Sequence, residues 1–225
     1  MFIMALIAML GVQTQAQIVS SRSSMTTRQV VDNENWSTLY LQWNPMSINP
    51  DHGDSESFTG FSIGYNKAVS LTQSIPLFLE AGLGIQYSFD SEEESDRDYD
   101  ESSWEESWYM LSAKIPVNLM YKFDIPNTNI SILPNAGLDF RFNIFGKSKE
   151  EWTYHGDTES ESWNLFDDDD MDGHAYKRFQ MGWHIGVNAM FNKKFMVGVS
   201  YGSDFSEIRD DVKLSGGAIT LGYCF

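Results

Sequence analysis

Between residue 36 and the end of the chain, several stretches show apolar residues at every second position. In the clearest stretch, residues 75–89, Leu77, Leu79 and Leu83 alternate with Phe78, Glu80 and Gly84. A period of two places successive side chains on opposite faces of an extended backbone, so it predicts β-strands. Eight such stretches occur, at residues 36–44, 58–67, 75–89, 108–123, 130–146, 178–191, 195–203 and 213–225.

The connections between these stretches are of two kinds, and the two kinds alternate. Four are acidic, at residues 46–57, 90–107, 147–177 and 204–212. The three between them are short, at residues 67–74, 124–129 and 192–194. Outer-membrane barrels have long extracellular loops and short periplasmic turns. We therefore expect an all-β, eight-stranded antiparallel up-and-down transmembrane β-barrel, with acidic extracellular loops and both termini in the periplasm.

A soluble barrel of the lipocalin type is the main alternative, because it reverses the pattern and places the apolar face inside. Charged residues such as Glu80 and Lys114 share one face, whereas the other face is almost wholly apolar. Aromatic residues such as Tyr121 and Phe123 gather near strand ends, as they do at membrane interfaces. The membrane barrel accounts for all three features.

The N-terminus predicts export. An apolar run, residues 1–12, is followed by Thr14, Gln15 and Ala16, which is typical of a signal peptide cleaved after residue 16, although no Lys or Arg precedes the run. We expect a signal peptide at 1–16, a flexible N-terminal segment at 17–35 and a barrel domain at 36–225. A buried N-terminal helix is the alternative for the apolar run.

The formal net charge of −17 argues against nucleic acid as a partner. Residues 90–107 carry −9 of this charge and residues 147–174 carry −8, so two connections account for it. With Cys224 as the single cysteine, no disulfide can form within the chain.

Ionisable residues on the polar face should point into the barrel. Side chains just fill an eight-stranded barrel, and buried charges must pair. We expect a polar network that stabilises and closes the lumen; a narrow ion or proton path is the alternative. The expected members are Glu80, Lys114, Asp139, Arg141, Arg178 and His184.

A run of aspartates resembles part of a calcium loop. Asp168, Asp170 and Asp172 precede Gly173 with the spacing of EF-hand positions one, three, five and six. Position twelve is Phe179 instead of the bidentate glutamate, so the segment is not an EF-hand. We expect weak Ca²⁺ binding at most, and no other cofactor.

Two further functions are considered for the acidic connections. His155, Asp157, Asp172 and His174 could form a rim active site, but no matching residues follow on other strands, so we expect no enzyme. Acidic segments that also carry Trp104, Trp108, Trp152, Tyr154 and Trp163 suit a basic protein surface. We expect a monomer that binds such a partner or cations.

The last strand resembles the C-terminal signal that the outer-membrane assembly machinery reads, with Ile219, Leu221, Tyr223 and the terminal Phe225 at alternate positions. With the segments at residues 75–84 and 115–119, the chain resembles the PorT-like outer-membrane β-barrel family of gram-negative bacteria. The resemblance implies an eight-stranded barrel in the outer membrane, in contact with its lipid. Some relatives are linked to protein secretion, so a secretion-associated barrel is a further alternative.

Overall fold

The computed structural model describes residues 33–50, 55–96, 102–154, 157–171 and 175–225. The expected signal peptide at 1–16 lies outside these residues, as does all of the segment at 17–35 except its last three residues. Both stay predictions.

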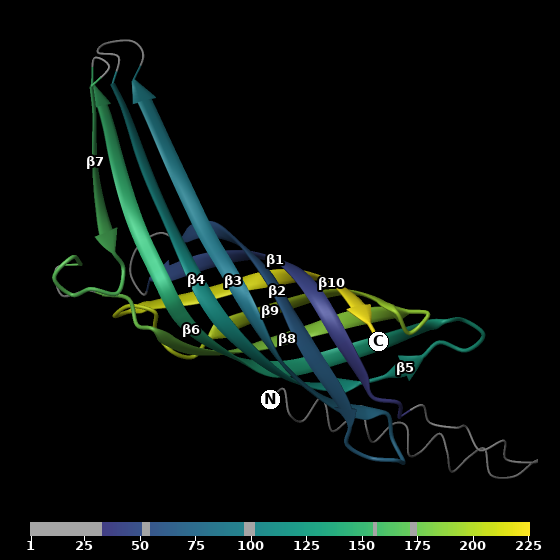
Figure 1. Cartoon of the computed structure of the whole chain (residues 1–225). Helices are drawn as coiled ribbons and strands as arrows, with labels where there is room; N and C mark the ends of the chain where they lie inside the picture. The colour runs from purple at the N-terminus through teal and green to yellow at the C-terminus, as the bar shows by residue number, and fades with distance from the viewer. Residues whose placement is uncertain (1–32, 51–54, 97–101, 155–156, 172–174) are drawn as a thin grey trace, which may run out of the picture. The chain divides into compact units, whose positions relative to one another are not determined.

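Antiparallel strands make up almost all of the described chain. Eight of them form a closed ring in the order β1, β2, β3, β4, β6, β8, β9, β10, in which β10 pairs with β1 and β4 pairs with β6 (Figure 1). The all-β, antiparallel ring of eight strands is therefore confirmed. The bounds are β1 Trp36–Pro50, β2 Glu56–Ser70, β3 Leu77–Asp96, β4 Ser102–Tyr121, β5 Phe123–Asp124, β6 Ile130–Tyr154, β7 Asp157–Asn164, β8 Phe179–Phe191, β9 Phe195–Asp204 and β10 Val212–Cys224.

The apolar side chains of the ring face outward. Leu83 is 65% exposed and Ile63 60%, whereas Gln86, on the opposite face of β3, is 2% exposed. A lipocalin-type barrel would bury the first two and expose the third, so that alternative is wrong. The alternation found in the sequence thus presents an apolar band outside and a mostly polar surface inside.

The two ends of the ring differ. At the turn end, which carries the connections β2–β3, β4–β6 and β8–β9, the links are short. Asn192 and Lys193 both have positive φ there, and Lys194 N–H donates to the Phe191 carbonyl, as in the type I′ turns that suit hairpins. The opposite end, the acid end, carries the acidic connections.

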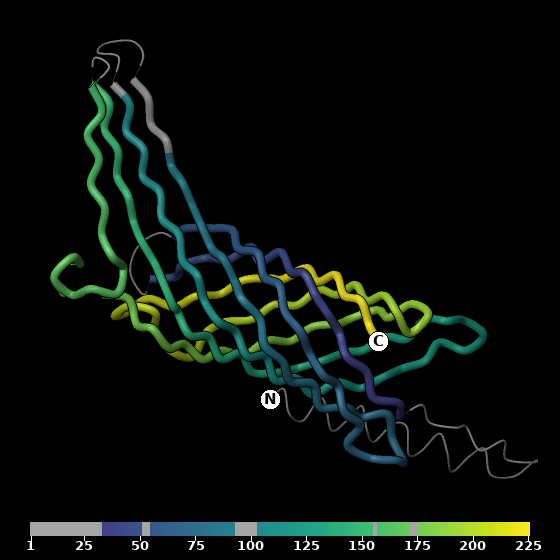
Figure 2. Tube along the Cα trace, in the orientation of Figure 1, coloured from purple at the N-terminus to yellow at the C-terminus, as the bar shows by residue number. Residues whose placement is uncertain are grey.

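Much of the acid end is strand, not loop. β3, β4 and β6 continue past the ring, and β7 adds a fourth strand beside β6 (Figure 2). We call this four-stranded part the platform; it comprises residues 90–96, 102–109, 147–154 and 157–164. The expectation of irregular loops over 90–107 and 147–177 was therefore wrong for most of these residues, because backbone pairing persists where both faces are polar.

A β-bulge sets which β6 side chains face inward on the platform. Ser112 is opposite Asn143 and Leu111 is opposite Phe145, so Ile144 is an extra residue in β6. Asn143 is buried inside the ring, and beyond the bulge it is the even-numbered Gly146 that is buried. The bulge thereby turns Ser148 and Glu150 to the lumen side.

The lumen is filled in three layers. An apolar cluster closes the turn end, and a second one lies at the acid end, around Phe58, Met110, Ile208, Val212 and Leu214. Polar residues fill the middle. The sequence pattern predicts a polar network that closes the lumen, and it does not predict the two apolar layers. The turn-end cluster comprises Trp36, Ala68, Phe78, Met120, Leu133, Met190, Met196 and Cys224.

Candidate functional site

Two regions carry candidate function: the middle of the lumen and the platform. In the lumen, the Asp139 carboxylate contacts one side chain from each of the two neighbouring strands. Its carboxylate lies 3.4 Å from Lys114 Nζ on β4 and 2.6 Å from His184 Nδ1 on β8. Each side chain belongs to the inward set of its strand, so adjacent strands bring them together.

Asn118 extends this contact to Glu80. Its amide nitrogen donates to Glu80 Oε1 at 2.9 Å, and its Oδ1 lies 2.6 Å from His184 Nε2. Asn66 also donates to Glu80 Oε1, at 3.1 Å. Both ring nitrogens of His184 thus lie against side-chain oxygens, so the ring links Asp139 to Asn118.

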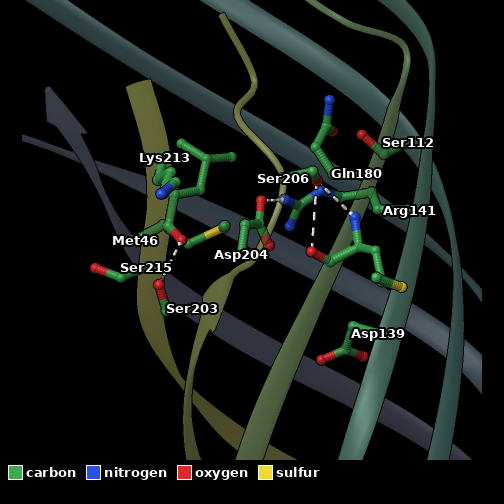
Figure 3. Close-up of polar contacts among 12 residues, drawn as sticks. Met46, Ser112, Asp139, Arg141, Gln180, Ser203, Asp204, Ser206, Lys213 and Ser215 are labelled. Atoms are coloured by element: carbon green, nitrogen blue, oxygen red, sulfur yellow. Dashed lines mark hydrogen bonds and ion pairs between the residues drawn. The ribbon is translucent and has the colours of Figure 1, made fainter. Parts of the chain in front are cut away.

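Arg141 forms the second centre of the lumen network. It pairs with Asp204 at 2.5 Å, and the two side chains point toward one another from β6 and β9, the strands on either side of β8 (Figure 3). The hydropathy pattern predicts Asp204 in an acidic connection and does not indicate this role. The signal was present, because Asp204 has the same parity as the inward Gly198, Ser200 and Gly202. The network thus joins side chains of β3, β4, β6, β8 and β9.

Arg178 is the expected lumen residue that the structure places elsewhere. It lies at the acid-end rim, one residue before β8, and is exposed. Its guanidinium donates to the carbonyls of Asn143 and Ile144 and lies 4.6 Å from the ring centre of Phe166. The alternation fails here because the residue precedes the strand. Gln180 takes the inward place, fully buried, and accepts a hydrogen bond from Asn143.

Little space remains in the middle of the lumen. Two cavities of ≈ 60 Å³ each border the network. Tyr40 lies across Gly64 and Gly84, where an added Cβ would come within 2.5 Å and 2.3 Å of its hydroxyl. These glycines leave room for the tyrosine ring.

On the platform, cross-strand register sorts side chains onto two unlike faces. The face that continues the lumen side has acidic and aromatic residues, and we call it the acid-aromatic face. The other face has mainly Ser and Thr among its described side chains, together with Glu105, Tyr109, Lys147, Lys149 and Glu151. Among described side chains, the acid-aromatic face carries Asp90, Glu92, Glu106, Glu150, Asp157, Glu159, Glu161, Trp104, Trp108, Trp152, Tyr154 and Trp163, and no Lys or Arg.

One row of this face is glutamate in all four strands. Glu92 is opposite Glu106, Glu106 opposite Glu150, and Glu150 opposite Glu161. Like charges directly opposite each other destabilise a sheet. Burial raises the pKa of Glu106, and the neighbouring carboxylates, Glu150 first among them, raise it further. The row therefore carries unfavourable charge that a bound cation would relieve.

A cavity of ≈ 530 Å³ lies at the foot of the acid-aromatic face, and we call it the mouth cavity. Glu56, Glu106, Glu150 and Asp170 contribute its carboxylates. Its aromatic residues are Trp108, Trp163 and Tyr176, and Arg209 is its one base.

The expected calcium residues are only partly described. Asp172 lies outside the described residues, Asp168 is exposed, and Asp170 accepts a hydrogen bond from the Asn164 amide at 2.8 Å. Within the described ranges, no group of three acidic, His or Cys side chains is placed to hold a metal ion. Calcium binding stays a prediction.

Of the four residues considered for a rim enzyme, the structure describes one, Asp157. His155, Asp172 and His174 lie outside the described residues, and Asp157 begins β7 opposite Tyr154. The expected assembly residues Ile219, Leu221, Tyr223 and Phe225 all lie exposed on the outer face at the end of the chain. That they act as a signal stays a prediction.

Comparison with known families decides the identity of the barrel. The model of the outer membrane protein beta-barrel domain matches residues 2–225. The chain belongs to this family. Membership places it in the outer membrane of a gram-negative bacterium, in agreement with the apolar outer band. The narrower resemblance of this outer membrane protein to the PorT-like group stays a prediction.

Solved structures of other outer-membrane barrels are similar at low identity. Ail of Yersinia pestis, in complex with the heparin analogue sucrose octasulfate, is 17% identical with a TM-score of 0.39, covering 85% of this chain and 99% of Ail. Neisserial surface protein A is 12% identical with a TM-score of 0.39 (84% and 95% covered). The outer membrane enzyme PagL is 14% identical with a TM-score of 0.43 (82% and 97% covered).

Among curated proteins, none matches the chain. In the described residues, no helix has the length and apolar character to cross a membrane.

Proposed function

We propose that this outer membrane protein is a closed, non-enzymatic barrel that holds an acidic binding platform at the cell surface. In this proposal the acid end is extracellular, and the turn end and both termini are periplasmic. The observation that carries it is the acid-aromatic face: paired strands present carboxylates and tryptophans on one side of a rigid sheet.

The closed lumen follows from its three layers. Apolar clusters lie at both ends, and charged residues in the middle pair with one another. The two cavities of ≈ 60 Å³ beside the network are each large enough for only a few waters. Purified protein in planar bilayers should therefore show no steady conductance. Stable open channels would contradict the closed barrel and favour an ion path.

The chemistry of the platform favours a basic protein partner. Carboxylates steer a cationic surface toward the face, and tryptophans provide contact area once it has docked. A nucleic acid or another polyanion would be repelled. The partner we expect is a protein or peptide rich in Lys and Arg.

The test is binding of a lysine-rich peptide to the purified protein in detergent micelles, measured at low and at physiological salt. Glu106 and Glu105 are adjacent in sequence but face opposite ways on β4. Glu106→Gln should weaken binding severalfold, whereas Glu105→Gln should change it little. Equal losses in both variants would show attraction by net charge alone, and no binding by the wild type would end the proposal.

A further inference from the structure

The mouth cavity differs from the rest of the acid-aromatic face because it encloses space. Its walls come from β1, β2, β4, β6, β7 and the connections before β8 and β10. Carboxylates reach it from three strands and one connection: Glu56 of β2, Glu106 of β4, Glu150 of β6, and Asp170. Among the described residues, Glu106 and Glu150 have neither a hydrogen bond nor an ion pair through their carboxylates.

The floor and walls are apolar and aromatic. Ile48, Leu165 and Val212 line the cavity with Trp108 and Trp163. Trp108 is held by Phe58, with ring centres 4.8 Å apart, so its position is fixed by the apolar cluster beneath. A ligand here would meet aromatic and aliphatic surface together with negative charge.

Cation–π contacts already occur at this mouth. The guanidinium of Arg209, the one base of the cavity, lies 5.7 Å from the ring centre of Tyr176. Arg178 makes the same kind of contact with Phe166 nearby. Two rings at this end of the barrel thus accept organic cations of the chain itself, which leaves Trp108 and Trp163 as the aromatic groups of the cavity without such a partner among the described residues.

The cavity suits an organic cation better than a metal ion. A bare Ca²⁺ needs six to eight oxygens at 2.3–2.6 Å, whereas these carboxylates lie on separate elements around a space of ≈ 530 Å³. A weakly hydrated ammonium or guanidinium group on an apolar stem uses aromatic faces as well as charge. The crowding of carboxylates that raises the pKa of Glu106 would be relieved by such a group.

We infer that the mouth cavity binds an ammonium or guanidinium group carried on an aliphatic stem. Two sources share this chemistry: a free polyamine, or a Lys or Arg side chain of the basic partner. The second source rests on the proposed function, and the first is independent of it.

Calorimetry on the purified full-length protein in micelles tests the inference with three probes: spermidine, the lysine-rich peptide, and CaCl₂. Wild type should bind spermidine or the peptide, and Glu150→Gln and Trp163→Ala should each weaken that binding about three- to tenfold. Trp152→Ala is the matched control, because Trp152 lies on the acid-aromatic face but not in the cavity. Heat-modifiable gel mobility verifies that each variant is folded.

Each outcome decides a point. Spermidine binding that depends on Trp163 supports a site for free cations, and peptide binding alone with the same dependence supports capture of a side chain. Peptide binding that Trp163→Ala and Trp152→Ala leave equally unchanged overturns the cavity site while the proposed platform stands. CaCl₂ binding as tight as spermidine, insensitive to Trp163→Ala, shows simple charge attraction and overturns the inference. If neither spermidine nor the peptide binds, both proposals fall.

Discussion

The lumen and the platform treat charge in opposite ways. In the lumen, Lys114 pairs with Asp139 and Arg141 pairs with Asp204, and the Glu80 carboxylate accepts hydrogen bonds from two asparagine amides. On the acid-aromatic face, the described side chains include seven carboxylates and no base. Ion pairs inside the barrel join its strands, whereas carboxylates that lie opposite each other on the platform weaken their own sheet. The two regions thus differ in whether a carboxylate has a cation beside it among the described residues.

The largest effect is expected when one partner of a buried ion pair in the lumen is removed. Arg141→Ala leaves Asp204 buried without its cation, and removal of one partner from a buried pair costs about 3–5 kcal/mol. We expect a large drop in the temperature at which the protein changes mobility on SDS gels. The double variant Arg141→Ala/Asp204→Ala should recover much of the loss. A single variant as stable as the wild type would contradict a structural role for the pair.

Packing in the lumen offers the next largest effect. At Gly64, an added Cβ would lie 2.5 Å from both the Leu83 carbonyl and the Tyr40 hydroxyl. Gly64→Ala should therefore destabilise the barrel by about 1–3 kcal/mol, as overpacking does. Gly217→Ala is the control, since its nearest contact would be 3.5 Å away. Equal transition temperatures for the two variants would mean that the lumen is not tightly filled.

On the platform, removal of a charge should increase stability, whereas in the lumen it should decrease stability. Glu150→Gln relieves repulsion from Glu106 and Glu161, so we expect the platform to gain about 0.2–1 kcal/mol per relieved pair. Amide exchange at residues of β4 and β6 beyond the ring would slow accordingly. Faster exchange in this variant would show that the row is held by contacts of Glu150 and that its charge is not a cost.

The smallest effect is a dependence on pH. The pKa of Glu106 is raised in the folded platform above its ordinary value of 4.5, by burial and by Glu150, Glu56, Glu92 and Asp90. A raised carboxyl pKa means that the folded state binds the proton more tightly than the unfolded state does, so platform stability falls as pH rises from about 4.5 through the raised value. Proteolysis of the platform should be slower at pH 5 than at pH 8. Glu106→Gln should flatten this difference; an unchanged slope would assign it to another group.

The membrane part of the fold was largely predictable from sequence. Outward residues such as Leu83 and Ile63 must be apolar, whereas many inward ones are small or polar, so a period of two is visible in all eight ring strands. The platform was missed because neither of its faces is apolar. Trp104, Glu106 and Trp108 do alternate with serine and Glu105, but hydropathy does not register that contrast.

The site was less predictable. The pairing of Lys114 and His184 with Asp139 depends on strand register, which the sequence pattern leaves open. The extra residue Ile144 reverses which β6 side chains face the lumen side, and no residue type in the sequence indicates a bulge at this position. Arg178 and Asp204 were misplaced because the sequence pattern does not define where strands end. β8 begins after Arg178, and β9 continues as far as Asp204.

The platform ends in two open strand edges, β7 on one side and residues 90–96 of β3 on the other, with no further neighbour among the described strands. An open edge is a template for joining another chain into the same sheet. Asp157, Glu159 and Glu161 alternate along β7, so two copies meeting edge to edge would set carboxylate against carboxylate. The same acidity would therefore oppose edge-to-edge pairing between two copies of this protein.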